Sequence, residues 1–407
     1  MRRLIILLLV ILIGFVVLNF LFKSESINIC ENFDCVINES NLNFENFVHS
    51  QNQTIVDYSG KEIKLRGVNL GGWLMWEGWI WGAGFDSQTK MLKRLEEATD
   101  KRSLDWFKKN VYKSFVTESD IEAISDLGFN VIRVPINHAF LEDPENWSIL
   151  DNLIDWCKKY NVYIVLTLHS APGGQANFFT ADPDKILLWD SKENISQTLT
   201  LWKQISERYK EEKIIAGYDL INEPSAEDSQ VVDLYKALVA VLRNNGDKHM
   251  IVIEGNNFAK DFNIFQSPIS KNQTYSFHMY TWFGDDREKL LNRYTELSKK
   301  QNVPIWVGEF GENEYEMLES TVDMFENRNL AGWAFWTWKR LPNKYPALVE
   351  IESSGKWNIV ANYIKSFFVL KKPTKQEMIE GMDYFLNTVR FENNRVNNKM
   401  LEILLPR

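Results

Sequence analysis

Short runs of apolar and β-branched residues alternate along most of the 407-residue chain with longer stretches in which apolar residues recur every three or four positions. The short runs predict β-strands, and the longer stretches predict amphipathic helices. Eight strands are expected, at residues 63–68, 130–135, 162–168, 214–221, 250–254, 274–278, 304–307 and 332–336. Helices are expected at residues 118–127, 150–160, 196–209, 231–244, 287–301 and 315–327.

This alternation is typical of βα units arranged around a parallel sheet. A closed (β/α)8 TIM barrel accommodates eight such units in one domain, and we predict this α/β fold for residues 53–371. A doubly wound open sheet would produce a similar pattern at this level of detail.

The first 22 residues follow a different pattern. Arg2 and Arg3 precede an uncharged apolar run over residues 4–22, which is long enough as a helix to cross a bilayer. Because no small-residue cleavage site follows Phe22, we expect an uncleaved signal anchor, with a cleaved signal peptide as the alternative. The positive charges before the run predict that the chain beyond it lies outside the cytoplasm, tethered to the membrane or secreted.

Two further segments flank the predicted barrel. Residues 23–52 are polar and rich in Asn, so we expect a linker that holds the domain away from the membrane. Residues 372–407 are expected to form a C-terminal helical extension, because Thr374 and Glu377 have the spacing of a capping box at a helix start. The long, charged region over residues 85–112 has no predicted role.

Composition narrows the function classes. The net charge is -9 and no long block of Lys or Arg occurs, which argues against nucleic acid as a partner because phosphate binding requires clustered cations. Cys30 and Cys35 are spaced to close a small loop in an oxidising compartment, and Cys157 is expected to be a buried thiol. No Cys and His pair has zinc-ligand spacing. We also expect the protein to be a monomer.

A barrel of this kind carries its active site at the mouth formed by the carboxyl ends of its strands. Polar residues follow the predicted strands at these ends. The candidates are Asn69, Arg133, His169, Asn222, Glu223, Glu254, His278, Tyr280, Glu309 and Trp336. Taken singly, a buried His or Arg is more often a structural residue. Polar groups at so many strand ends nevertheless favour an active site at the barrel mouth. Nothing in the sequence around Glu254 requires chemistry, so we interpret that residue as structural.

Glu223 and Glu309 stand out among these candidates. Glu223 follows an apolar strand and precedes Pro224, and Glu309 ends another apolar strand beside Gly308. Their separation of 86 residues fits three βα units, which places them on the fourth and seventh strands. Two carboxylates across a barrel mouth suit the cleavage of a glycosidic bond, in which one acid with a raised pKa protonates the leaving oxygen and the other, ionised, attacks or activates water.

Four motifs occur in the order in which glycoside hydrolase family five carries them, and the chain resembles this family of retaining, cellulase-like enzymes over residues 60–370. The motifs are Asn222-Glu223-Pro224, His278-Met279-Tyr280, Gly308-Glu309-Phe310-Gly311 and Trp336-Thr337-Trp338-Lys339. The resemblance implies a (β/α)8 barrel with Glu223 as acid/base and Glu309 as nucleophile. It also implies a sugar subsite lined by Arg133, His169, Asn222, His278, Tyr280 and Trp336, without metal or cofactor.

Residues 66–74 and 169–175 resemble the exo-β-1,3-glucanase branch of this family. In that branch, the acidic residue matched by Glu77 holds the terminal glucose. The chain departs from the branch at Ser170, where Gly is usual, and at Gly78, where Pro is usual. The linkage therefore stays open between β-1,3 and β-1,4.

We expect a retaining β-glycosidase that hydrolyses O-glycosidic bonds of β-glucans outside the cytoplasm. Transglycosylation on the same glucans is an alternative, because a sugar hydroxyl can intercept the same glycosyl-enzyme intermediate. A non-catalytic glycan-binding surface protein that has kept the fold is the alternative from another class.

Overall fold

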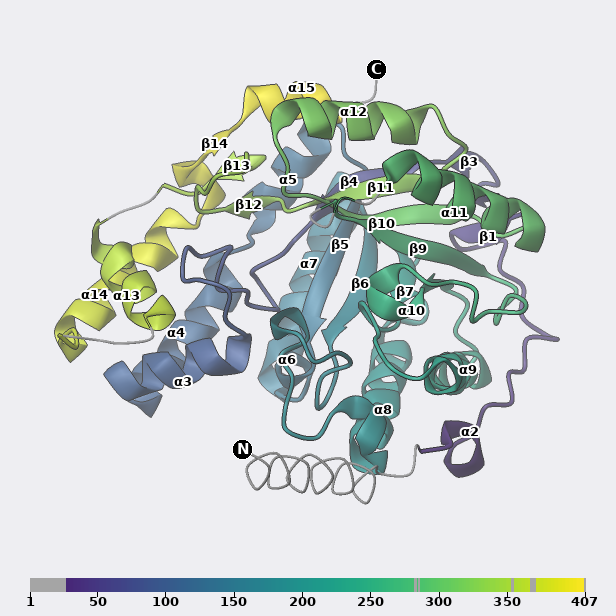
Figure 1. The fold of residues 1–407 in the computed structure, drawn as a ribbon, viewed down its shortest axis with the longest axis horizontal. Coiled ribbons are helices and arrows are strands. Elements are labelled where there is room, and N and C mark those ends of the chain that lie inside the picture. The colour runs from purple at the N-terminus through teal and green to yellow at the C-terminus, as the bar shows by residue number, and fades with distance from the viewer. Residues whose placement is uncertain (1–26, 282–283, 285, 353–354, 367–370, 406–407) are drawn as a thin grey trace, which may run out of the picture.

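The computed structural model describes residues 27–281, 284, 286–352, 355–366 and 371–405. Its centre is a closed barrel of eight parallel strands, visible in Figure 1. These strands are β4 (Leu65–Asn69), β5 (Val131–Asn137), β6 (Tyr163–Ser170), β7 (Ile215–Asp219), β8 (Met250–Glu254), β9 (Gln273–Met279), β10 (Ile305–Gly311) and β11 (Gly332–Trp336). Each pairs with the next along the chain, and β11 closes the ring against β4. The closed ring confirms the predicted barrel and rules out the open sheet.

The helices between the strands also follow the predicted alternation. The six expected helices are α5 (Glu118–Asp126), α7 (Trp147–Tyr160), α8 (Lys192–Tyr209), α9 (Asp228–Asn244), α11 (Arg287–Gln301) and α12 (Tyr315–Glu326). Short helices α6 (His138–Leu141) and α10 (Asn256–Ala259) lie in loops after β5 and β8. Strands β6 and β10 extend further than predicted, so His169 and Glu309 lie within their strands.

The barrel interior changes from apolar to polar along its axis. One buried cluster includes the inward-facing residues Leu65, Val131, Val165, Val252, Trp306 and Ala334. Because side chains alternate along a strand, residues two positions later face the same way. Arg133 follows Val131 and Glu254 follows Val252 in this manner, and both are buried. An apolar plug therefore supports a polar layer beneath the mouth.

Two regions without a predicted partner pack against each other. Helices α3 (Gln88–Ala98) and α4 (Lys101–Ser114) come from the long insertion after β4, and α13 (Gly355–Lys365) and α14 (Lys375–Thr388) follow the barrel. These four helices lie together on one side of the barrel in Figure 1. Their interface is aromatic: Phe107 and Trp357 both contact Phe385, with ring centroids 6.1 and 4.1 Å away. The capping box at Thr374 and Glu377 begins α14 as predicted.

The C-terminal residues are not purely helical. Strand β14 (Arg395–Val396) pairs with β13 (Val349–Glu350), which pairs with β12 (Lys339–Arg340), and α15 (Asn398–Leu404) follows. Phe391 stacks on Trp338 with ring centroids 5.7 Å apart. The expected helical extension therefore includes a strand and packs against the segment that follows β11.

The segment expected as a polar linker differs from that expectation over residues 27–52. Ile29, Phe47 and Val48 are fully buried or nearly so, and α2 (Ile29–Asn32) packs against α9. Strand β1 (His49–Gln51) pairs with β2 (Thr54–Val56), which pairs with β3 (Glu62–Ile63). Polar residues dominate the composition of this segment, which is why the sequence suggested a linker. The few apolar residues among them are the ones that pack against the domain.

Two expectations about the N-terminal region have different outcomes. Cys30 and Cys35 form a disulfide, which fits an oxidising compartment. The expected anchor, residues 1–22, lies outside the described residues. Within the described part of the chain, no helix combines the length and the apolar character needed to cross a membrane.

Candidate active site

Glu309 reaches the barrel interior through an irregularity in β10. Trp306 faces inward, so strict alternation would turn residue 309 outward. The register of β10 against β9 shifts between Val307 and Glu309, and a bulge of this kind re-aims the side chains that follow it. Gly308 permits the close approach of β10 to β9 at this point, because a Cβ at residue 308 would lie 2.3 Å from the Ser276 hydroxyl oxygen.

Glu223 lies beyond the end of β7, in a loop with strained backbone. Its φ of 45° is in the left-handed region, which costs a residue other than glycine about 1–2 kcal/mol. The Glu223 N–H donates to Glu254 Oε2 at 2.6 Å, and this charge-assisted hydrogen bond holds the turn in place. The strained backbone thus positions the Glu223 carboxyl over the barrel.

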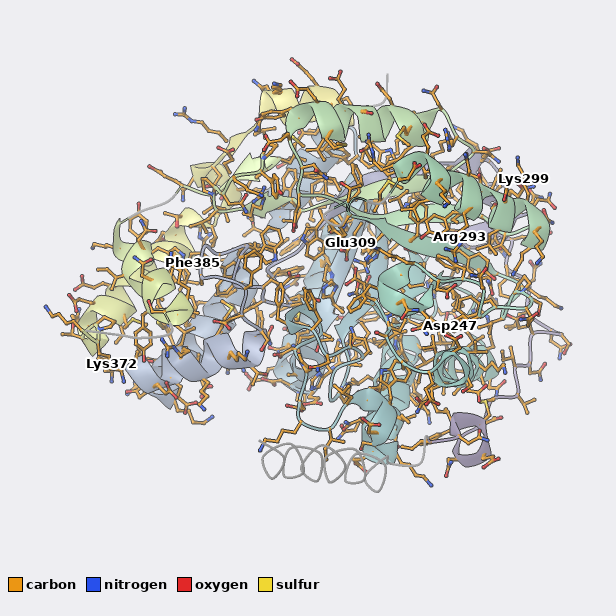
Figure 2. The ribbon with its side chains drawn as sticks, viewed as in Figure 1. Asp247, Arg293, Lys299, Glu309, Lys372 and Phe385 are labelled. Atoms are coloured by element: carbon orange, nitrogen blue, oxygen red, sulfur yellow. A yellow bond between two sulfur atoms is a disulfide. The ribbon has the colours of Figure 1, made fainter. Side chains whose placement is uncertain are left out.

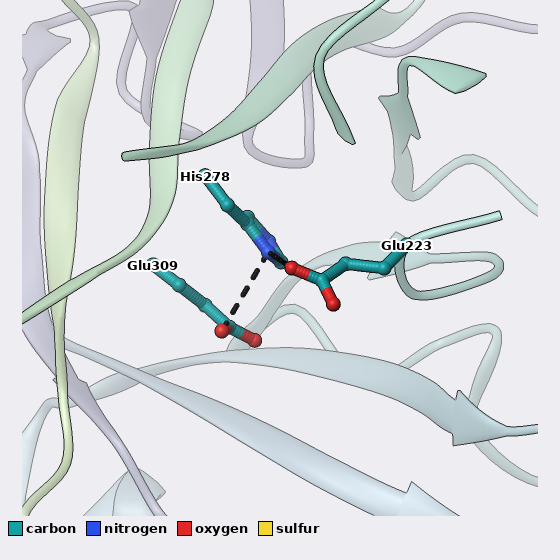
Figure 3. A group of neighbouring side chains, drawn as sticks. All are labelled: Glu223, His278 and Glu309. Carbon is teal, nitrogen blue, oxygen red and sulfur yellow. Dashed lines mark hydrogen bonds and ion pairs between the residues drawn. The ribbon is translucent and has the colours of Figure 1, made fainter. Parts of the chain in front are cut away.

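The two glutamates face each other with His278 between them, as Figure 3 shows. One carboxylate oxygen of Glu223 and one of Glu309 lie within 4.8 Å of each other. His278 Nδ1 lies 2.8 Å from Glu223 Oε1 and 3.6 Å from Glu309 Oε2. The two carboxyl groups are therefore close enough to flank one bond.

Glu309 accepts hydrogen bonds on both oxygens. Arg133 Nη1 donates to Oε1 at 2.5 Å, and the Tyr280 hydroxyl donates to Oε2 at 2.9 Å. Burial and the neighbouring Glu309 charge raise the pKa of Tyr280 well above its usual value, so the hydroxyl keeps its proton and remains a donor. A carboxylate held by a guanidinium and a phenol is fixed in orientation.

Arg133 is the centre of the polar layer and is completely buried. Besides Glu309, its guanidinium donates to Asn69 Oδ1 at 3.0 Å, Asp219 Oδ2 at 2.8 Å, Asn222 Oδ1 at 2.8 Å and Glu254 Oε1 at 3.1 Å. A buried cation is tolerated when its donors are satisfied in this way. Three of the strand-end candidates, Asn69, Arg133 and Asn222, thus lie together. Glu254, interpreted as structural, and Asp219, which was not a candidate, join them.

Glu254, which we interpreted from the sequence as structural, lies in the same polar layer. It is fully buried, contacts Arg133 and the backbone of Glu223, and its Oε1 lies 3.2 Å from His278 Nε2. Asp219 beside it has its pKa raised to about 8, first by burial and then by the charge of Glu254. Asp219, like Glu254, ends a strand on the inward-facing side, and this alternation was the signal that could have identified it.

The pKa shifts of Glu223 and His278 both favour the proton on the histidine. Burial disfavours a charged imidazole, but the carboxylates of Glu254 and Glu309 raise the pKa of His278 well above its usual value. Burial would also raise the pKa of Glu223, yet the hydrogen bond and charge of His278 outweigh it and hold this pKa below its usual value. This differs from the raised pKa expected for a general acid, because the sequence did not reveal the charge of the adjacent histidine.

Glu223, His278 and Glu309 also have the spacing of three metal ligands. Both ring nitrogens of His278 face carboxylates, with Nδ1 2.8 Å from Glu223 Oε1 and Nε2 3.2 Å from Glu254 Oε1. Arg133 already supplies a positive charge to Glu309. These side chains therefore have ionisable partners within the protein.

A second group of predicted residues forms the opposite wall of the mouth. His169 stacks on Trp336, with ring centroids 5.5 Å apart and planes within 10°. His169 Nε2 lies 3.5 Å from Glu77 Oε1, and the other oxygen of Glu77 accepts a 2.6 Å hydrogen bond from the Trp79 indole. Trp79 had no expected role, because closely spaced tryptophans usually pack in cores.

Burial controls the charge of this wall. It raises the pKa of Glu77 to about 8, although the Trp79 hydrogen bond acts in the opposite direction. Burial lowers the pKa of His169 to about 4, so this imidazole is neutral near neutral pH. Glu312, on the loop after β10, also has its pKa raised to about 8 by burial and by Glu77. Between about pH 4 and 8, neutral hydrogen-bonding groups therefore dominate this wall.

The sequence profile described as "Cellulase (glycosyl hydrolase family 5)" matches residues 56–341, more than half of the chain. The chain belongs to glycosyl hydrolase family 5. Membership confirms the resemblance found in the sequence and makes the protein a glycoside hydrolase.

Relatives in family 5 carry several activities in their names. A protein named beta-xylosidase from Phanerodontia chrysosporium is 28% identical over 331 residues, which cover 70% of this chain and 69% of the relative. A probable glucan 1,3-beta-glucosidase A from Emericella nidulans is 25% identical over 356 residues, covering 68% of this chain and 85% of the relative. Family membership therefore leaves the sugar and the linkage open.

Solved structures resemble the fold of this family 5 chain. A rutinosidase from Aspergillus niger superposes with a TM-score of 0.57 at 20% identity, covering 70% of this chain and 92% of that chain. The catalytic domain of the endoglucanase Cel5A from Thermobifida fusca gives a TM-score of 0.51 at 16% identity, covering 83% and 97%. At these identities the likeness supports the barrel fold and carries no information on the substrate.

Proposed function

We propose that this family 5 protein is a retaining β-glycosidase that acts by double displacement, with Glu223 as acid/base and Glu309 as nucleophile. The observation that carries the proposal is the close approach of their carboxylate oxygens, within 4.8 Å. Retaining enzymes hold their two carboxyl groups about 5–5.5 Å apart, whereas inverting enzymes need about 6.5–9.5 Å to admit a water molecule.

In the first step, Glu309 attacks the anomeric carbon and the bond to the leaving oxygen breaks. Arg133 and Tyr280 hold the attacking carboxylate through one hydrogen bond to each oxygen. Glu223 protonates the leaving oxygen. His278, whose pKa is raised, can supply this proton directly through the 2.8 Å hydrogen bond between the two side chains.

In the second step, Glu223 takes a proton from water, which attacks the anomeric carbon and releases Glu309. The sugar keeps its configuration after two inversions. The remaining predicted residues would bind the sugar: Glu77, His169, Asn222, His278 and Trp336. Transglycosylation uses the same intermediate with a sugar hydroxyl in place of water.

For the substrate we propose a β-glucan, cleaved outside the cytoplasm. A glucan 1,3-beta-glucosidase among the relatives supports a β-1,3 linkage, and the buried acid Glu77 suits a pocket that binds a terminal glucose. The disulfide between Cys30 and Cys35 supports an extracytoplasmic location. Because another relative is named a beta-xylosidase, a β-xyloside is the second candidate.

Azide rescue of two alanine variants tests the assigned roles. Glu309→Ala should lose at least about 10⁴-fold in kcat, and with an activated aryl β-glucoside azide should restore turnover as the α-glycosyl azide. Glu223→Ala should retain formation of the intermediate, and azide should then yield the β-glycosyl azide. The opposite pairing of variants and anomers would overturn the assignment, and α-configured products from the wild-type protein would exclude retention.

A further inference from the structure

Four phenylalanines form an exposed aromatic ridge, defined as Phe85, Phe178, Phe179 and Phe258. Their rings touch in sequence: Phe85 lies 5.7 Å from Phe179, Phe179 lies 4.7 Å from Phe178, and Phe178 lies 5.9 Å from Phe258 between centroids. The exposed fractions are 74% for Phe85, 43% for Phe178 and 37% for Phe258. Large apolar side chains gathered on a surface mark a binding site more often than isolated ones do.

The ridge belongs to the mouth of the barrel. Phe85 lies in the loop after β4, Phe178 and Phe179 lie in the loop after β6, and Phe258 lies in α10 after β8. Loops that follow parallel strands converge at the carboxyl end of the barrel. Three separate loops thus contribute rings to one continuous surface beside the active site.

Phe258 is held in place by a strained and tightly bonded turn. Asn257, Phe258 and Ala259 all have φ between 53° and 62°, a conformation that Phe and Ala adopt only at a cost of about 1–2 kcal/mol each. The side chain of Asn256 bonds to Ala226 through both its oxygen and its nitrogen, which braces the turn. Strain of this kind persists where the surrounding structure overdetermines the conformation, often at ligand sites.

The turn also ties the ridge to the side of the mouth where Glu223 lies. The Phe258 N–H donates to the carbonyl of Pro224, the residue after Glu223, at 3.3 Å. A general acid stands beside the oxygen that leaves with the aglycone. The ridge therefore adjoins the loop that carries the acid.

We propose that the aromatic ridge binds an apolar, non-sugar aglycone, so that the substrates include β-glycosides of alkyl or aryl alcohols. Phenylalanine has no hydrogen-bonding group, so four adjoining rings bind through apolar contact, and an alkyl or aryl group covers them without burying a hydroxyl that needs a partner. This inference rests on the proposed β-glycosidase activity, and it extends that activity from glucans to glycosides with apolar leaving groups.

Alkyl β-glucosides of increasing chain length test the inference, because the apolar area changes while the leaving alcohol keeps nearly the same pKa. For the wild-type protein, kcat/KM should rise on the order of tenfold from butyl to octyl glucoside, since one face of the added chain is covered. In the double variant Phe85→Ala/Phe258→Asn, this ratio should fall below about twofold. Asn suits the left-handed backbone at 258 and should relieve strain there.

Controls separate this inference from the proposed function. Val36→Ala changes a residue that is also 74% exposed but lies in the N-terminal segment, and it should keep the wild-type ratio. Phe85→Ala alone should reduce the ratio partially. If the wild-type protein turns over β-glucosyl fluoride but its kcat/KM does not depend on alkyl chain length, the role of the ridge is contradicted and the proposed glycosidase activity is not. Equal losses for octyl glucoside and laminaribiose would identify a sugar platform instead, and no turnover of the fluoride would contradict the proposed activity.

Discussion

At the scale of single residues, two buried groups of the mouth favour their protonated forms for different reasons. His278 gains a proton because carboxylates surround it, whereas Glu77 keeps one because it is buried and has a single hydrogen-bond donor. Between about pH 4.5 and 8, the unfolded chain releases the Glu77 proton and the folded protein retains it. The folded state then binds more protons, so this group makes stability fall as the pH rises.

The variant Glu77→Gln should remove that dependence. Gln can still accept the Trp79 hydrogen bond but does not titrate, so its melting temperature should decrease less between pH 5 and 8 than that of the wild-type protein. Calorimetry at several pH values measures the difference. Parallel pH profiles for the two proteins would show that Glu77 ionises in the folded state as it does in the unfolded chain.

At the scale of elements, the helices outside the barrel depend on local start signals and on one shared aromatic interface. Helix α14 begins at Thr374, whose hydroxyl accepts from the Glu377 N–H at 3.2 Å while Glu377 bonds back to the Thr374 N–H. Its buried face places Phe385 against Trp357 and Trp81. The local signal sets where the helix starts, and the interface sets where it lies.

Thr374→Ala should therefore destabilise the protein by about 1 kcal/mol through loss of the cap, without disturbing the aromatic interface. Thermal unfolding should show a decrease of about 1–3 °C. Asp383→Ala, at an exposed position in the middle of the same helix, provides the matched control and should leave the midpoint nearly unchanged. An effect of equal size at both positions would argue that the cap contributes nothing.

At the scale of the whole molecule, the N-terminal segment is fastened to the barrel by a buried ion pair. Glu39 Oε1 accepts from Arg243 Nε at 2.8 Å, and the Arg243 side chain is fully buried. The remaining Arg243 donors reach Ser270 and the carbonyls of Asp247 and Asn272. Within the part of the chain that the structure describes, Arg243 forms its ion pair with Glu39, so removing this carboxylate would leave a buried cation without that partner.

We expect Glu39→Gln to destabilise the protein by about 3 kcal/mol, because breaking a buried ion pair leaves an uncompensated charge. Limited proteolysis should then release the N-terminal segment at temperatures where the wild-type protein resists. Glu45→Gln, an exposed acid of the same segment, is the control and should behave like the wild type. Resistance of both variants would mean that apolar contacts alone hold the segment.

The sequence by itself determined the features that depend on local periodicity. Alternating patterns located eight strands and six helices, and glutamates at the ends of apolar strands pointed to Glu223 and Glu309. Family membership confirmed the resemblance carried by the motifs around these residues.

Tertiary structure decided what depends on residues distant in the chain. The bulge in β10 turned Glu309 inward against the alternation of its strand, and the pairing of His278 with Glu254 placed the proton away from Glu223. The contacts of the N-terminal segment and of α14 with the rest of the protein could not be predicted from the sequence either. Strand periodicity is encoded within a few neighbouring residues, whereas register shifts, charge coupling and docking depend on groups that only the folded chain brings together.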